Sequence, residues 1–213
     1  MKGDGQNAVQ VLLLVGAISL VPALLFTVTG FTRILIVLGF IRSGLGTPTS
    51  PPNQVLVGIA LFLTIFVMAP VFGQIKKEAV DPLLANKISQ AEALKRGQEP
   101  LREFMFKQTR TKDLALFVKL AGMKEQPKTR GDIPTYVLIP SFIISELKTA
   151  FQIGFLVFLP FLLIDLIVSS TLMSMGMVML PPVFISLPFK ILLFVLVDGW
   201  GLVTKSLVQS FHT

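Results

Sequence analysis

Long stretches without a charged side chain constrain the fold of this chain more than any other feature. No Asp, Glu, Lys or Arg occurs in residues 5–32, 43–75 or 166–189. Each run is at least as long as the roughly 20 apolar residues that cross a bilayer as an α-helix. Only 15% of all residues are charged, compared with about 25% in soluble domains. These observations predict an integral membrane protein.

The apolar sequence falls into two blocks, residues 1–75 and 133–213. Nearly every apolar segment is interrupted by proline: Pro22, Pro70, Pro140, Pro160, Pro181, Pro182 and Pro188. Inside a membrane, backbone groups freed by a proline need partners on neighbouring helices. We therefore predict an all-α membrane protein of about four long, proline- and glycine-broken apolar helical segments, arranged as hairpins within a larger helical complex. One break is expected near Thr29-Gly30, after a kinked first segment at about residues 9–28.

Residues 76–132 have a different character and separate the two blocks. They carry 13 Lys or Arg and 8 Asp or Glu. Their apolar side chains recur at helical spacing, as in Leu114, Phe117 and Val118. This segment is predicted to be a small, water-exposed helical insert.

Half of the eight methionines stand at alternate positions in the C-terminal block: Met173, Met175, Met177 and Met179. The tract contains Gly176 and is followed by Pro181-Pro182. Methionine is flexible and polarizable, so it fills irregular gaps and can re-pack around a changing partner. The tract could act as a deformable seal or constriction, whereas composition alone favours ordinary packing in a core.

Five charged residues lie inside apolar sequence of the C-terminal block: Glu146, Lys148, Asp165, Lys190 and Asp198. A charge at the bilayer centre costs at least about 2.5–3.5 kcal/mol, so such residues usually face a protein interior or a water-filled path. Their signs nearly cancel, which favours ion pairing within a protein assembly over a proton path. Lys190 is expected to pair with Asp165 or Asp198. Together with Arg33, the five form the predicted set of buried charges and subunit contacts.

The sequence lacks the residues of common catalytic and metal sites. It has no cysteine, and its single histidine, His212, stands next to the C-terminus. Gly44-Leu45-Gly46 lacks the lysine of a phosphate-binding loop, and no Ser–His–Asp set is present. The net charge of +7 fits membrane topology better than nucleic-acid binding, because no basic patch is interleaved with aromatics. We expect neither an enzyme nor a bound metal or cofactor.

Several strings resemble the P-type subunit of the bacterial flagellar export gate, the FliP family, whose relatives serve injectisome type III secretion systems. The most specific are Glu-Leu-Lys-Thr-Ala-Phe-Gln-Ile-Gly at 146–154 and the pair Leu-Pro-Phe-Lys and Val-Asp-Gly-Trp within 187–200. Further matching segments are 31–38, 51–56, 60–64, 140–154 and 160–165. Together the matches cover almost the whole chain.

The resemblance implies a role that periodicity does not indicate. Subunits of this family form a ring, pentameric in related assemblies, with Q-type and R-type partners and other membrane subunits of the export apparatus. The ring lies in the bacterial inner membrane at the flagellar basal body and passes unfolded export substrates. The family's methionine tract forms a gasket around the channel. The matching positions are Met177, Val178 and Met179, preceded by Met173 and Met175; family members often carry a further methionine where Val178 stands.

Alternatives remain at this stage. The chain could serve an injectisome rather than a flagellum, and buried charges on broken helices also occur in ion-coupled transporters, although no inverted repeat is visible. A purely structural membrane scaffold is a third class. Many family members carry a cleaved signal peptide; the start of this chain shows none, and its first apolar run is interpreted as retained.

Two arguments disagree about the side of the membrane on which the insert lies. The positive-inside tendency places a segment with this excess of Lys and Arg in the cytoplasm. The family places the insert outside it. We follow the family and expect residues 76–132 to be extracytoplasmic.

Overall fold

The structure is built from helices alone, within the residues that it describes. The computed structural model describes residues 16, 19, 22–123, 127, 129–177 and 179–211. The elements there are a helix at Pro22–Val28, α2 (Phe31–Gly44), α3 (Asn53–Ile75), the π-helical turn η1 (Lys76–Val80), α4 (Asp81–Leu84), α5 (Gln90–Gln108), α6 (Thr111–Leu120), the 3₁₀ turn η2 (Arg130–Asp132), α7 (Thr135–Ser174), α8 (Pro182–Leu196) and α9 (Gly199–Gln209). The predicted all-α fold class is confirmed.

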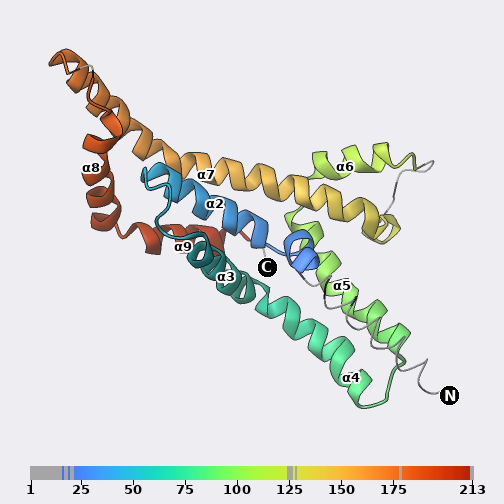
Figure 1. Cartoon of the computed structure of the whole chain (residues 1–213). Helices are drawn as coiled ribbons and strands as arrows, with labels where there is room; N and C mark the ends of the chain where they lie inside the picture. Colours follow the sequence, from blue (N-terminus) through green and yellow to red (C-terminus); the bar gives the residue numbers. More distant parts are fainter. Residues whose placement is uncertain are drawn as a thin grey trace, which may run out of the picture.

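Helix α7 is the axis of the molecule. Its 40 residues correspond to about 60 Å at 1.5 Å per residue, about twice the thickness of a bilayer's hydrocarbon core. Helix α2 lies along its middle, α5 and α6 pack near its first half, and α8 folds back along its last part (Figure 1). The far end of the α7/α8 hairpin projects away from the other helices.

The core forms where α2 is enclosed between α7 and α3. Helix α2 turns a stripe of buried side chains inward, with Phe31, Ile34, Leu38 and Ile41 at helical spacing. Burying one such side chain stabilises a fold by about 1.5–3 kcal/mol. A glycine on α7 permits the close approach of α2, because a Cβ atom at Gly154 would lie 2.4 Å from the ring of Phe40.

Two helices are long and apolar enough to cross a membrane, and two bent helix pairs reach that length together. The single helices are Asn53–Leu84, which combines α3, η1 and α4, and Thr135–Ser174. The bent pairs are Pro22–Val28 with Phe31–Gly44, at 82°, and Pro182–Leu196 with Gly199–Gln209, at 64°. These spans confirm the prediction of long, broken apolar helical segments.

The positions of the breaks differ in part from the expected ones. Helices α3, α7 and α8 continue through their internal prolines, Pro70, Pro140, Pro160 and Pro188. A proline removes only one helical hydrogen bond, and the packing of the surrounding turns keeps the helix whole. The break expected at Thr29-Gly30 is present. The predicted kinked segment before it lies mostly outside the described residues.

The charged insert is helical, as expected from its periodicity. Helix α3 continues through η1 into α4, and α5 returns beside this rod (Figure 1). Ser89 begins α5 as its N-cap, since its hydroxyl oxygen accepts a 3.2 Å hydrogen bond from the backbone N–H of Glu92. Helix α6 then packs on α7. The division at residues 76 and 132 remains a prediction.

Candidate functional site: an exposed methionine hairpin and buried ion pairs

The methionine tract forms the tip of the α7/α8 hairpin. After Met175, the C-cap of α7, the chain turns at Gly176, whose φ is 78°. The N–H of Gly176 donates to the carbonyl of Met173 at 3.1 Å, and that of Met177 to the carbonyl of Leu172 at 2.9 Å. These two bonds define a Schellman motif, which explains why glycine stands here.

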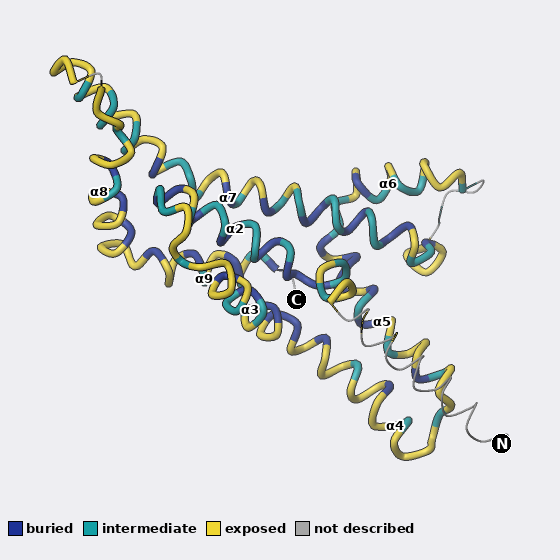
Figure 2. Tube along the Cα trace, in the orientation of Figure 1, coloured by how far each residue is buried: buried dark blue, intermediate teal, exposed yellow. Residues whose placement is uncertain are grey.

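The methionine side chains at this tip are open to the surroundings. Their exposed fractions are 65% for Met173, 64% for Met175, 44% for Met177 and 98% for Met179. Figure 2 shows the described part of the tip as exposed. Val178, the remaining predicted gasket residue, lies outside the described residues. Within this chain, therefore, the four methionines are not part of the packed core.

An ion pair ties the two arms of the hairpin together below the tip. The Lys190 ammonium on α8 donates to Asp165 Oδ2 on α7 at 2.7 Å. The hydroxyl of Ser186 donates to Asp165 Oδ1 at 2.6 Å. Lys190 is buried and Asp165 is partly buried, so the carboxylate is the more hydrated member of the pair.

A second ion pair lies at the centre of the molecule, between Arg33 on α2 and Glu146 on α7. Arg33 Nε donates to Glu146 Oε2 at 2.9 Å, and Nη2 donates to Glu146 Oε1. Both side chains are almost completely buried, at 2% and 1% exposure. A bidentate arrangement of this kind is the strongest form of an arginine–carboxylate contact.

The remaining donors of Arg33 join two more segments to this pair. Nη1 donates to the backbone oxygen of Ser210 at 2.8 Å and to its hydroxyl at 3.0 Å, and Nη2 donates to Gln108 Oε1 at 3.2 Å. All five N–H groups of the guanidinium are thus used. The ring of Phe211 lies 3.9 Å from the guanidinium carbon. One side chain therefore holds α2, α5, α7 and the segment after α9 together.

A third ion pair fastens α6 to α7. The carboxylate of Asp113 accepts hydrogen bonds from the Lys148 ammonium and, at 2.8 Å, from the Ser145 hydroxyl. Burial opposes ionisation of Asp113, but these hydrogen bonds and the charges of Lys148 and Arg110 hold its pKa below its usual value. Asp113 is buried while Lys148 is half exposed.

Five of the six charged residues predicted from the sequence take part in three separate ion pairs. Glu146 and Lys148, which are neighbours in sequence, have different partners. Asp198 has another role: it adopts a left-handed conformation with φ 50° and caps α9 by accepting from the N–H of Gly201 at 3.4 Å. The corner between α8 and α9 forms here. The subunit contacts predicted for these residues remain a prediction.

Sequence reasoning missed several polar partners of these pairs. Gln108 ends α5, Ser186 lies in α8 and Ser210 follows α9. Each is a single uncharged residue that only its contacts identify. Asp113 is one of many charges in the insert, so its sequence position does not distinguish it from a surface residue. Within the described part of the chain, no three His, Cys, Asp or Glu side chains gather as a metal site requires.

The fold and these sites define a class: an all-α membrane protein with buried ion pairs between helices and an exposed methionine hairpin. A family model described as the FliP family matches residues 14–207. The chain belongs to the FliP family, and the resemblance found in its strings is confirmed.

Similar proteins span nearly the full length of this chain. A flagellar biosynthetic protein FliP of Bacillus subtilis (strain 168) is 60% identical over 205 residues, covering 96% of this chain and 92% of that protein. One of Pectobacterium carotovorum is 56% identical, covering 100% and 83%. One of Aquifex aeolicus (strain VF5) is 46% identical, covering 99% and 89%.

Proposed function

We propose that this chain is a channel-forming subunit of the flagellar type III protein export gate, which passes unfolded substrates across the bacterial inner membrane. Membership of the FliP family and relatives that are named flagellar biosynthetic proteins support the flagellar role over an injectisome role. The methionine tract contributes the gasket of the channel.

The exposure of the hairpin tip is the observation that carries this proposal. Met179 is 98% exposed, and Met173, Met175 and Met177 are also uncovered. Contiguous exposed apolar surface marks a site that is covered by a partner or a membrane. A single hairpin cannot enclose a channel, whereas several copies arranged around an axis would bring their tips together. The proposed assembly is a homo-oligomeric ring, pentameric by analogy with related assemblies.

The chemistry of methionine suits a seal that must open and close. Its unbranched side chain has three rotatable bonds and a polarizable sulfur, so it adapts to partners of different shape. A ring of such side chains would exclude water and ions at rest and deform around a passing polypeptide. Gly176 and the turn after α7 lie within the tract. Part of its backbone is therefore not held by the regular hydrogen bonds of a helix.

The apolar flanks of the hairpin fit further partners. Large apolar side chains are more than half exposed on both arms: Phe155, Leu163 and Ile167 on α7, and Phe184 and Leu196 on α8. We assign this surface to lipid and to the Q-type and R-type gate subunits. An ion-coupled transporter fits the buried charges less well, because the donors of Arg33 are fully engaged inside the fold.

The seal is tested by replacing Met175, Met177 and Met179 together with alanine. The variant is expected to assemble normally and to raise the leakage of small ions through the complex in planar bilayers. The matched control replaces the same three residues with leucine, which keeps apolar volume and should leave leakage low. Unchanged conductance in the alanine variant would count against the gasket.

Assembly is tested separately by co-purification. The tagged full chain should bring down the Q-type and R-type subunits from membranes, and mass measurement of the complex gives the copy number. Recovery of the chain alone as a monomer would contradict the proposed function.

A further inference from the structure

Helix α6 presents a basic and apolar face that nothing in the described chain covers. One side of the helix is lined by four residues that are four, three and one positions apart: Lys112, Leu116, Lys119 and Leu120. Leu116 is 48% and Leu120 69% exposed. Neither lysine forms an ion pair with a residue that the structure describes. The other side of the helix packs against the core through Leu114, Phe117 and Val118, and Asp113 pairs with Lys148 of α7.

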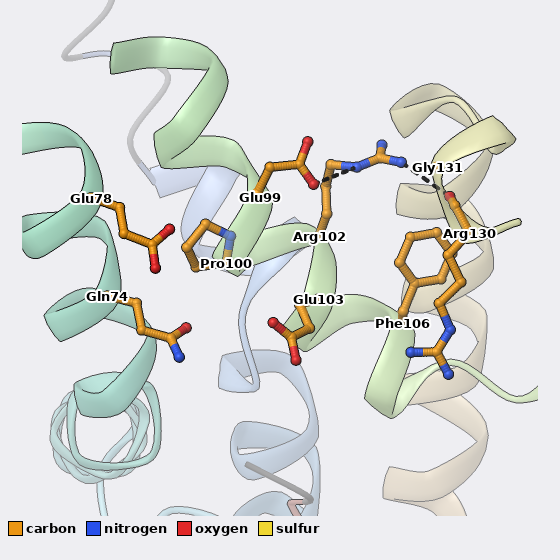
Figure 3. Close-up of a pocket in the computed structure, with 9 residues that line it drawn as sticks. All are labelled: Gln74, Glu78, Glu99, Pro100, Arg102, Glu103, Phe106, Arg130 and Gly131. Atoms are coloured by element: carbon orange, nitrogen blue, oxygen red, sulfur yellow. Dashed lines mark hydrogen bonds and ion pairs between the residues drawn. The ribbon is translucent and has the colours of Figure 1, made fainter. Parts of the chain in front are cut away.

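A pocket of complementary character lies elsewhere on the insert. It has a volume of about 300 Å³ and lies between η1, α5 and η2. Two arginines line its η2 side, and its acidic side toward α3 and η1 is formed by Glu78 and Glu103, with Glu99 turned to Arg102 (Figure 3). In Figure 3, Glu78 extends from η1 toward α5, and Glu103 turns its carboxylate to the same side. Pro100 and Phe106 supply an apolar lining.

The carboxylates of this pocket remain available to an incoming cation. Glu78 forms no ion pair with any described residue, and the pairs of Glu99 with Arg102 and of Glu103 with Lys107 are long, at 3.9 and 3.5 Å. Both members of the pair of Glu103 with Lys107 are exposed, and such pairs contribute little. Arg102 turns its guanidinium away from Glu78, toward the backbone oxygens of Arg130 and Ile133 (Figure 3).

We propose that α6 of one copy of this chain docks against the glutamate pocket of the next copy. Lys119 or Lys112 would enter the acidic side of the pocket, its methylene stem lying on Pro100 and its ammonium between the carboxylates of Glu78 and Glu103. Leu116 and Leu120 would cover the apolar rim. The inference rests on the proposed homo-oligomer and names the contact between its inserts.

The positions of the two surfaces make this a head-to-tail contact. Helix α6 lies on one side of α7, and the rod of α3, η1 and α4 lies on the other (Figure 1). A chain therefore cannot fill its own pocket with its own α6 without refolding. Two different surfaces on one protomer generate a ring when the rotation between neighbours closes. A contact between two different surfaces, such as this one, is what a cyclic gate requires.

Disulfide trapping between single-cysteine chains tests the contact directly, because the sequence has no native cysteine. Full chains carrying Lys119→Cys and Glu103→Cys, with tags of different size, are co-expressed in membranes and oxidised. A mixed dimer is expected. The matched control replaces Glu103→Cys by Lys95→Cys on an exposed turn of the same helix, and should give no mixed dimer.

Charge reversal provides the second test. Lys119→Glu in one copy or Glu78→Lys in the other should lower the yield of a crosslink between Lys112→Cys and Glu103→Cys by roughly tenfold or more, since like charges then meet. The double reversal should restore it. Neither residue has an ion-pair partner in the described chain, so the single changes leave the protomer's own pairs intact.

Mass measurement of the solubilised complex separates the two proposals. If the oligomer forms but the mixed dimer is absent, the docking of α6 is wrong and the proposed function stands. If the chain is monomeric both in membranes and after solubilisation, the docking of α6 and the proposed function are both wrong. Equal crosslinking from Glu103→Cys and from the Lys95→Cys control would also refute a specific contact.

Discussion

At the scale of single residues, the buried guanidinium of Arg33 carries the largest predicted effect. Arg33→Ala leaves the carboxylate of Glu146 buried without its partner, which should destabilise the chain by about 3–5 kcal/mol. Arg33→Lys keeps the charge but offers three donors in place of five, so an intermediate loss is expected. The thermal unfolding midpoint of the full chain in detergent measures both.

The matched control for Arg33 removes both charges. In Arg33→Met combined with Glu146→Leu, no buried charge is left unpaired, and most of the lost stability should return. A double variant as unstable as Arg33→Ala would show that the stability resides in the contacts to Ser210 and Gln108 rather than in the ion pair.

Asp113 gives a residue-scale prediction with a pH dependence. Its pKa in the folded chain lies below the ordinary value, so its contribution is present above pH about 4 and is lost as the pH falls through the folded pKa. Asp113→Asn should therefore lower stability at pH 7 by about 1–3 kcal/mol. Unfolding midpoints at pH 7 and pH 3 test this: the gap between wild type and variant should narrow at pH 3. An equal gap at both pH values would contradict it.

At the scale of elements, the α7/α8 hairpin depends on the pair of Lys190 with Asp165. Lys190→Ala removes a donor that lies 2.7 Å from Asp165, so the two arms should separate more easily and less complex should assemble. A second change, Asp165→Asn, should restore much of the assembly, because the unpaired carboxylate is then gone. Size-exclusion chromatography of the solubilised complex measures the yield.

Asp198 supplies the control for the hairpin. It caps α9 instead of pairing with Lys190, so Asp198→Asn should leave the defect of Lys190→Ala unchanged. Asparagine also accepts a capping hydrogen bond and tolerates a positive φ, and the α8/α9 corner should survive the change. Rescue by Asp198→Asn would show that this residue, and not Asp165, is the functional partner of Lys190.

The same elements show how far sequence alone reaches. The uncharged run at 43–75 predicted α3, because a membrane leaves few alternatives for such a segment. Gly30 marked a break, whereas the corner at Asp198 was missed. That corner depends on a close contact across it, because a Cβ atom at Gly199 would lie 2.3 Å from the ring of Phe194. The prolines of α7 suggested breaks that packing prevents.

The candidate site likewise has features that the sequence predicts and features that it does not. A charge in an apolar run reveals that it needs a partner, but not which one. The partner of Arg33 is 113 positions away in the chain, a distance that no local pattern spans. The Schellman motif at Gly176, by contrast, has a local origin, because its two hydrogen bonds join residues close together in the methionine tract.

At the scale of the whole molecule, the topology in the membrane decides how the insert and the hairpin tip are used. If Asn53–Leu84 crosses the bilayer, the loop before α3 and the insert lie on opposite sides. We expect the insert to be extracytoplasmic. A cysteine at Lys95, in the insert, should react with a membrane-impermeant maleimide in intact cells. A cysteine at Thr49, exposed in the loop before α3, should react only after permeabilisation.

The two reporters separate three outcomes because the native chain has no cysteine to compete. The reverse pattern would place the insert in the cytoplasm, as the excess of Lys and Arg suggests, and would turn the whole assembly around. Labelling of both positions from one side would mean that α3 does not cross the membrane. In that case its exposed apolar residues, such as Phe62 at 73% exposure, would face protein partners rather than lipid.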